Sequence, residues 1–202
     1  MKVSKSAVRR ELRAIRRGLA AGVVEAAGSA VVVSLRGSQR YRNARSVIGY
    51  LSNENEVPVS GLFPEIIESG RLLFLPASNS RQSLKRWRPG DPLAKGPGGV
   101  LEPVGGDSAS PASPTLALVP LVGWDLDGTR LGRGGGFYDR LFREMREGVY
   151  RVGVGYEFQC WPSLPSDPWD VKLHSVITER RIVEFSEDMS ALRKGGSEQW
   201  QI

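Results

Sequence analysis

The sequence predicts an α/β protein, a three-layer α/β/α sandwich with a mostly parallel sheet and an N-terminal amphipathic helix. Short apolar runs typical of buried strands alternate with helical patterns, and successive strands begin about 25 residues apart, as in parallel α/β sheets. The chain has 202 residues, 40% of them hydrophobic, which is enough to bury a sizeable core. We therefore expect one domain over residues 1–185 and a polar, frayed or disordered tail over 186–202.

The first predicted element is an amphipathic helix over residues 5–19. Its apolar stripe has a residue every three or four positions and contains Val8, Leu12, Ile15 and Leu19. A second stripe is basic and consists of Lys5, Arg9, Arg13 and Arg16. A row of like charges is unfavourable without neutralising anions, so we expect this stripe to face an anion; a solvated face is the alternative. Arg16 lies about three turns beyond Lys5 and is expected to contribute little to such a site.

The rest of the domain is predicted to alternate between helices and strands. Further helices are expected over residues 21–35, 62–69 and 137–147, and strands over 46–51, 71–76, 115–122, 150–156 and 172–178. Pro64 and Gly70 mark the start and stop of the helix over 62–69. Residues 96–114 are rich in Gly, Pro and Ser, and they predict a long surface loop in which only 100–103 is anchored.

Composition excludes several classes of protein. Cys160 is the only cysteine and His174 the only histidine, so an intrachain disulfide, a Cys/His zinc site and multi-histidine catalysis are excluded. No apolar run approaches the roughly 20 residues of a membrane-spanning helix, and no signal-peptide core follows the basic N-terminus, so we expect a cytoplasmic protein. The net charge of +6 favours an anionic partner, either a small metabolite or a nucleic acid.

The strongest functional signal lies in residues 118–140. An apolar strand runs into a loop with four glycines, at positions 132, 134, 135 and 136, and a helix then begins near Phe137. Glycines let consecutive backbone N–H groups form one concave surface, and the helix N-terminus adds partial positive charge. Arg130 and Arg133 supply forked donors for phosphate oxygens, and Asp139 can hold Mg²⁺ beside them. The segment therefore predicts a phosphate-binding loop.

Several alternatives remain beside this interpretation. The segment matches neither the P-loop nor the dinucleotide-binding pattern. The run Asp-Leu-Asp-Gly-Thr over residues 125–129 imitates the nucleophile loop of haloacid-dehalogenase-like phosphatases, although no paired-acid motif follows it. The glycines could also form only a tight turn. A third alternative is a basic nucleic-acid-binding α/β module, favoured by the N-terminal cations but lacking interleaved aromatic residues.

Residues 130–140 read Arg-Leu-Gly-Arg-Gly-Gly-Gly-Phe-Tyr-Asp-Arg, and this run resembles the signature of the 5-formyltetrahydrofolate cyclo-ligase, or methenyltetrahydrofolate synthetase, family. Other segments follow the family pattern in order: Lys5 with Arg9, 50–57 with Glu56, 70–76, 87–93, 102–103, 167–170 and 178–179. The resemblance covers about residues 5 to 180, and the ordered set is more specific than the glycine–arginine run alone.

The resemblance implies an ATP- and Mg²⁺-dependent conversion of 5-formyltetrahydrofolate to 5,10-methenyltetrahydrofolate, with release of ADP and phosphate. It implies a cytoplasmic ligase of one-carbon metabolism, with ATP as co-substrate and Mg²⁺ as cofactor. The implied partners are small molecules, including folate polyglutamates, with no nucleic acid and no membrane, and the implied state is a monomer. Phosphoryl transfer depends mainly on positioning and charge stabilisation, which suits a chain with one histidine.

The resemblance also assigns roles to individual residues. The implied catalytic residues are Lys5 and Arg133. The implied ATP-binding residues are Lys5, Arg9, Arg130, Leu131, Gly132, Arg133, Gly134, Gly135, Gly136, Phe137 and Tyr138. The implied substrate-binding residues are Tyr50, Leu51, Glu56, Trp87 and Tyr138. The implied metal ligands are Asp139 and Asp170.

Overall fold

The structure is a computed structural model, and it describes residues 4–77, 83–96, 99–105, 110–145 and 148–185. The tail predicted over 186–202 lies outside the described residues, as do parts of the loop predicted over 96–114.

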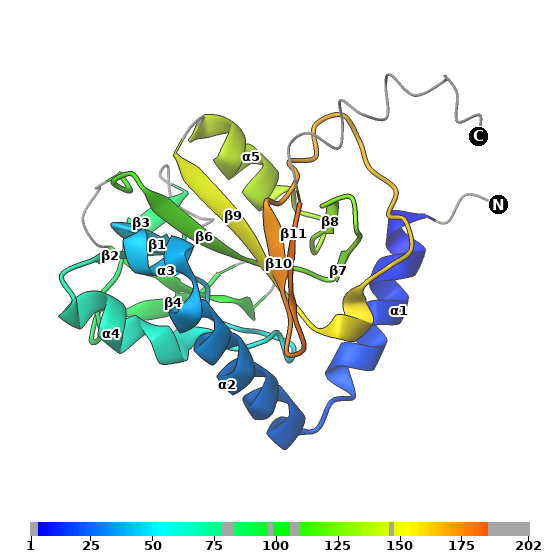
Figure 1. Cartoon of the computed structure of the whole chain (residues 1–202), viewed down its shortest axis with the longest axis horizontal. Helices are drawn as coiled ribbons and strands as arrows, with labels where there is room; N and C mark the ends of the chain where they lie inside the picture. Colours follow the sequence, from blue (N-terminus) through cyan, green and yellow to red (C-terminus); the bar gives the residue numbers. More distant parts are fainter. Residues whose placement is uncertain (1–3, 78–82, 97–98, 106–109, 146–147, 186–202) are drawn as a thin grey trace, which may run out of the picture.

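A seven-stranded sheet forms the centre of the molecule, in the order β11-β10-β9-β6-β1-β2-β3 (Figure 1). Its strands are β1 Ser46–Ile48, β2 Leu72–Pro76, β3 Leu84–Arg86, β6 Thr115–Pro120, β9 Val149–Val154, β10 Ser175–Ile177 and β11 Ile182–Glu184. The five inner strands pair in parallel, and the two edge strands β3 and β11 pair antiparallel. The predicted mostly parallel sheet is confirmed.

Helices cover both faces of this sheet. On one face, α2 (Ala21–Gly37) and α4 (Phe63–Glu68) share a buried apolar cluster with the sheet, for example through Val31 and Ile66. On the other face, α5 (Phe137–Glu144) packs through Leu141 and Phe142. The short elements α3 (Gln39–Asn43), η1 (Ser60–Leu62) and η3 (Glu157–Gln159) complete these layers. The architecture is the predicted three-layer sandwich.

Helix α1 (Lys5–Arg17) packs beside a small hairpin formed by β7 (Gly123–Trp124) and β8 (Arg130–Leu131) (Figure 1). Val8 and Leu12 are buried there, as the apolar stripe predicts. The stripe does not continue as predicted, because Ile15 is 47% exposed whereas the neighbouring Arg16 is 1% exposed. Arg16 faces inward because polar groups of the folded chain, brought there by distant segments, accept its hydrogen bonds.

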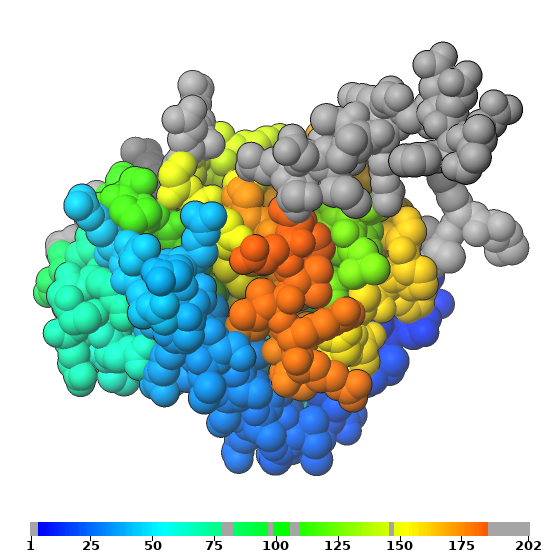
Figure 2. Space-filling view, viewed as in Figure 1, coloured from blue at the N-terminus to red at the C-terminus, as the bar shows by residue number. Residues whose placement is uncertain are grey.

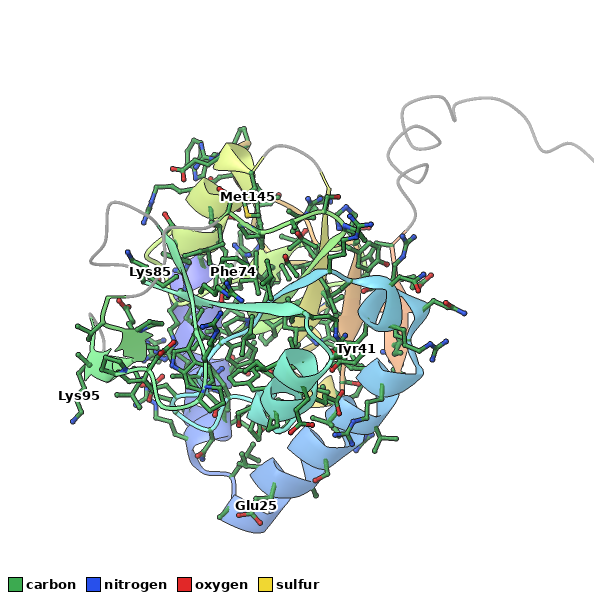
Figure 3. All side chains as sticks on the ribbon, turned by 90° about the vertical axis from the view of Figure 1, so that its left-hand side faces the viewer. Glu25, Tyr41, Phe74, Lys85, Lys95 and Met145 are labelled. Carbon is green, nitrogen blue, oxygen red and sulfur yellow. The ribbon has the colours of Figure 1, made fainter. Side chains whose placement is uncertain are left out.

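Several short elements of the structure were not predicted from the sequence. A second hairpin, β4 (Leu93–Lys95) with β5 (Leu101–Pro103), stands within and beside the segment predicted as a loop, and the anchored stretch at 100–103 is its second strand. Figure 3 shows Lys95 of this hairpin at the periphery, whereas Phe74 lies inside the molecule. Strands of three residues are too short for a period of two to be recognised. β1 and β10 were predicted because they are fully buried and form part of apolar runs, whereas β3, β4 and β11 are partly exposed and were not predicted.

Helices α1 and α2 together close the lower end of the molecule in the space-filling view (Figure 2). Within the described residues, no single helix has the length and apolar character needed to cross a membrane. Among the helices that the structure describes, the pair α1 and α2 meets both criteria when taken together, but it is bent by 104°.

Candidate active site

The main pocket, of about 860 Å³, opens at the carboxyl ends of β1, β2 and β6. From β1 the chain continues to β2 on one side and later returns to β6 on the other side. Such a reversal leaves a crevice at the strand ends, where open α/β sheets bind ligands. The crevice is lined by the residues that end or follow these strands, namely Tyr50, Leu51, Leu75, Pro76, Pro120 and Leu121.

The glycine loop between β8 and α5 forms a second wall. Gly134 has φ +112° and Gly136, at the start of α5, has φ +62°, conformations that side-chain-bearing residues rarely adopt. A Cβ on Gly134 would lie in ordinary contact with Arg9, so the backbone conformation and not a clash disfavours a side chain there. Arg9 donates from Nε to the carbonyl of Gly132 at 2.8 Å. The loop therefore requires glycine at position 134, and it is fastened directly to α1.

Arg130 is a buried cation in the pocket wall, and its side chain is 4% exposed. Its Nη2 donates to Asp139 Oδ1 at 2.7 Å, and its guanidinium lies 5.6 Å from the ring centroid of Tyr138. Its Nε and Nη1 have no hydrogen-bond partner among the described residues. Buried polar groups in native proteins almost always have partners, so these two donors indicate an anionic ligand in the pocket.

Lys5 joins the pocket from the N-terminal end of α1. Its Nζ lies 2.5 Å from Asp170 Oδ2 and 2.8 Å from Asp167 Oδ2. Partial burial opposes ionisation of both Lys5 and Asp170, but their hydrogen bonds and opposite charges outweigh it. The pKa of Lys5 is therefore raised and the pKa of Asp170 lowered, so both groups are charged at neutral pH.

Asp139 and Asp170 are the carboxylates predicted to hold Mg²⁺, and both line the pocket. Asp139 Oδ1 accepts hydrogen bonds from Arg130 and from the N–H of Val171 at 3.1 Å, which brings the start of α5 next to the segment carrying Asp170. Within the described part of the chain, no cluster of three or more His, Cys, Asp or Glu residues could hold a metal alone. One or two carboxylates completed by phosphate oxygens and water are a typical Mg²⁺ ligand set, so the donors fit this ion.

Glu56 also lines the pocket and is 6% exposed. Its Oε1 accepts from Arg133 Nε at 3.1 Å, and its Oε2 accepts from the N–H of Asn53 at 3.2 Å. Burial raises the pKa of Glu56, while the nearby guanidiniums of Arg133 and Arg16 act in the opposite direction. Tyr50 fixes the same loop, because its hydroxyl donates to the carbonyl of Val57.

The structure brings nearly all of the predicted site residues to this one pocket. The predicted residues that line it are Lys5, Arg9, Tyr50, Leu51, Glu56, Arg130, Leu131, Gly132, Arg133, Gly134, Gly135, Gly136, Phe137, Tyr138, Asp139 and Asp170. The exception is Trp87, which was predicted in the substrate wall and does not line the pocket. Trp87 packs edge-on against Phe63, with ring centroids 5.9 Å apart, at the margin of the core cluster below the sheet.

Sequence reasoning missed several residues of the pocket. Asp167 and Trp169 closely precede the predicted metal ligand Asp170 in the chain, so their proximity could have been inferred. The segment 100–102 lines the pocket from the β4–β5 hairpin, which no sequence signal connects with the glycine loop. Arg16, which was expected to contribute little, does not line the pocket itself, but its Nη2 lies 3.7 Å from Oε1 of the pocket residue Glu56. Arg16 lies close to Glu56 because the loop carrying Glu56 folds back onto the end of α1.

The residues that suggested a phosphatase or a nucleic-acid-binding module have structural roles. Asp125, the nucleophile of the phosphatase alternative, is buried and accepts hydrogen bonds from the N–H groups of Asp127, Thr129 and Leu164. It therefore closes the turn of the β7–β8 hairpin. The basic stripe of α1 is turned onto the protein, since its four cations donate to carboxylates or carbonyls of other segments.

A three-layer α/β fold with a cationic, glycine-rich pocket at the switch point of its sheet defines an enzyme that acts on small anionic molecules. Residues 1–179 match the 5-formyltetrahydrofolate cyclo-ligase family. The chain belongs to this family, and it is accordingly an enzyme of the ligase class.

Individual relatives agree with this assignment. The chain is 28% identical to the 5-formyltetrahydrofolate cyclo-ligase of Haemophilus influenzae over 177 residues, which cover 84% of this chain and 95% of that protein. It is 29% identical to the enzyme of the same name from Mycolicibacterium smegmatis, over 88% of this chain and 95% of that protein. The solved structure of 5,10-methenyltetrahydrofolate synthetase from Aquifex aeolicus matches with a TM-score of 0.76 and 31% identity, covering 98% of this chain and 97% of that one.

Proposed function

We propose that this enzyme converts 5-formyltetrahydrofolate to 5,10-methenyltetrahydrofolate, using ATP and Mg²⁺ and releasing ADP and phosphate. The observation that carries the ATP-dependent part is the buried Arg130, which has two unpartnered guanidinium donors in a pocket that also holds Lys5, Arg9 and Arg133. A triphosphate supplies the negative charge and the oxygen acceptors that such a cluster requires.

In the proposed reaction, the formyl oxygen of the folate attacks the γ-phosphorus of ATP, and the bond from this phosphorus to the oxygen that leaves with ADP breaks. The folate N10 then attacks the activated formyl carbon and loses its proton. The C–O bond breaks, inorganic phosphate leaves, and the five-membered ring of 5,10-methenyltetrahydrofolate closes.

The cations of the pocket would hold the nucleotide. Lys5 and Arg133 are the proposed catalytic residues, because they would touch the transferring phosphoryl group and stabilise the charge that develops on it. Arg9, Arg130 and the backbone N–H groups of residues 132–136 would bind the remaining phosphate oxygens.

Asp139 and Asp170 would hold Mg²⁺ against the phosphates. When bound, Mg²⁺ neutralises phosphate charge. Both carboxylates form ion pairs in the structure, Asp139 with Arg130 and Asp170 with Lys5. Nucleotide phosphates would give these cations new partners and leave carboxylate oxygens available to the ion.

The folate would occupy the side of the pocket that carries Glu56. This carboxylate is a strong acceptor for the N–H groups of the pterin ring, and Tyr50, Leu51 and Tyr138 supply aromatic and apolar surface. A pocket of about 860 Å³ has room for parts of both substrates side by side.

The experiment that tests the proposal follows methenyltetrahydrofolate formation by absorbance, with ATP and Mg²⁺ added separately and together. We expect turnover only when both are present and no turnover in excess chelator. Equal turnover in chelator would contradict the metal assignment. Hydrolysis of simple phosphoesters without folate would favour the phosphatase alternative instead.

We further propose that the enzyme acts as a monomer in the cytoplasm and uses folate polyglutamates as well as the monoglutamate. One chain supplies every wall of the described pocket, and a single cysteine suits a reducing compartment. Light scattering of the purified protein should give a mass near 22.1 kDa, and twice that mass would contradict the monomer.

A further inference from the structure

Arg16 is a buried charge that does not line the pocket. It stands in the last turn of α1 and is 1% exposed. Its Nε donates to the carbonyl of Glu54 and its Nη1 to the carbonyl of Leu121, both at 2.9 Å. Its Nη2 has no hydrogen-bond partner among the described residues. Burial of a guanidinium is costly unless a nearby anion compensates, so the neighbours of Nη2 explain its position.

Two carboxylates face this nitrogen. Arg16 Nη2 lies 3.7 Å from Glu56 Oε1 and 3.7 Å from Glu54 Oε2. Glu56 Oε1 is also bonded by Arg133, so the carboxylate is held between a guanidinium from α1 and one from the glycine loop. Five titratable or charged groups interact electrostatically with Glu56. They are Arg16, Arg133, Tyr50, Tyr138 and Tyr156.

The loop that carries Glu56 is strained and is tied to the same end of α1. Glu54 and Asn55 have φ of 51° and 57°, a left-handed conformation that asparagine tolerates but that costs energy in glutamate. Asn55 Nδ2 donates to the carbonyls of Arg16 and Arg17, which end α1, and of Leu19 just beyond it. Contacts with α1 therefore hold this loop in a conformation that the isolated segment would not favour.

We propose that Arg16 is a positioning residue for the folate site, which acts by holding Glu56 in the orientation that receives the pterin. This inference rests on the proposed function, because it assigns the folate to the Glu56 side of the pocket. Each oxygen of the Glu56 carboxylate has a second acceptor position beyond the one used within the protein, and the ring N–H groups of the substrate would bind there.

Arg16 also affects the charge of Glu56. Burial raises the pKa of this carboxyl, and Arg133 and Arg16 lower it. Loss of Arg16 would raise the pKa further, so that more of the carboxyl is protonated at a given pH. A protonated Glu56 accepts hydrogen bonds less well, so the acidic limb of the activity profile should move to higher pH.

The test is a double-mutant cycle with Arg16→Gln, Glu56→Gln and the combined variant. Arg17→Gln is the matched control, since Arg17 is 56% exposed, is adjacent on the helix and lies near Glu54 rather than Glu56. We expect Arg16→Gln to raise the KM for 5-formyltetrahydrofolate roughly tenfold, to leave the KM for ATP within about twofold, and to move the acidic limb upward. In the background of Glu56→Gln, the Arg16→Gln substitution should raise the KM for 5-formyltetrahydrofolate by less than about a further twofold.

A purely structural role makes the opposite predictions. The inference is overturned if the effects of Arg16→Gln and Glu56→Gln on the KM for the folate multiply in the double variant. It is also overturned if Arg16→Gln raises the KM for ATP as much as the KM for the folate and leaves the acidic limb at its wild-type pH. If Arg16→Gln does not fold, Arg16→Lys replaces it in the comparison, because this variant keeps the positive charge. We expect Arg16→Lys to raise the KM for the folate by a smaller factor and to leave the acidic limb where it is in the wild type. A KM and an acidic limb that both equal those of the wild type would overturn the inference. A wild-type protein without folate turnover would instead contradict the proposed function.

Discussion

At the scale of single residues, the site is a set of charges that neutralise one another within the protein. Lys5 pairs with Asp170, Arg130 with Asp139 and Arg133 with Glu56. The pairs of Lys5 and Arg133 join segments that are far apart in the chain, and the Arg130–Asp139 pair spans the glycine loop, so the pocket keeps its shape while holding a high density of charge. Binding of phosphates would exchange these partners rather than create charges in an empty pocket.

Lys5→Ala should weaken the use of ATP and leave the affinity for 5-formyltetrahydrofolate much less changed. A charge-assisted contact is worth roughly 1.5–3 kcal/mol, which corresponds to about a ten- to more than a hundredfold loss of apparent ATP affinity. Arg10→Ala is the control, because Arg10 lies on the same helix, is exposed and does not line the pocket. Equal KM values for ATP in the two variants would remove Lys5 from the nucleotide site.

Asp139→Asn should reduce turnover more than tenfold, because the substitution removes a carboxylate ligand of Mg²⁺. Asp139 also accepts hydrogen bonds from Arg130 and Val171 and stands in the first turn of α5, so some loss of stability is expected as well. Turnover at saturating Mg²⁺ and the thermal midpoint are measured together. Near-normal turnover with a lowered midpoint would show that Asp139 has only a structural role.

At the scale of elements, α1 and the glycine loop act together. The N-terminal half of α1 carries Lys5 and Arg9 to the nucleotide side of the pocket, and its last turn carries Arg16 to the side of Glu56. The loop meets the helix between these points, where Arg9 bonds to Gly132. One rigid helix therefore sets the spacing of the two proposed substrate sites.

The two neighbouring glycines of this loop should differ in their tolerance of a side chain. Gly134→Ala should lower the free energy of unfolding by about 1–3 kcal/mol, because alanine is strained at φ +112°. Gly135→Ala should change it by less than about 1 kcal/mol, since a Cβ there meets no atom within 4 Å and the backbone is not in the positive-φ range. Urea unfolding without substrates measures both, and equal effects would contradict the strain argument.

At the scale of the whole molecule, ion pairs fasten peripheral elements to the sandwich. Arg13 of α1 donates to Glu54, and Arg181 beside β11 donates to Glu157 of η3. The hydrogen bond from Arg13 lowers the pKa of Glu54. Burial raises the pKa of Glu157, but hydrogen bonds from Arg181 and Thr178 outweigh it and leave this pKa below its usual value.

A carboxyl whose pKa is lowered by folding stabilises the protein above its unfolded pKa, near 4.5, and this stabilisation is lost as the pH falls through the folded pKa. The double variant Glu54→Gln/Glu157→Gln should therefore lose less stability than the wild type between pH 6 and pH 3.5. Partly exposed pairs contribute up to about 1 kcal/mol, so the difference in midpoint should be about 2–4 °C. Identical pH dependence by circular dichroism would contradict these pairings.

The sequence by itself determined the fold class, the order of the main elements and most of the site. Helical periodicity in residues 5–17 and apolar runs such as 115–120 are local signals, because they report which face of one segment is buried. The glycine–arginine run was recognisable because the conformation of that loop and its charges depend on neighbouring residues. Each of these features is determined by residues that are close together in the sequence.

Only the tertiary structure decided how distant segments meet. Arg16 was expected to contribute little to the site, whereas the structure buries it against the loop of Glu56. Trp87 was expected in the substrate wall, whereas in the structure it packs on Phe63. The β4–β5 hairpin contributes residues 100–102 to the pocket without any local signal. The physical reason is that the burial of a charge or an aromatic ring depends on the partner it finds across the fold, and periodicity within one segment carries no information about that partner.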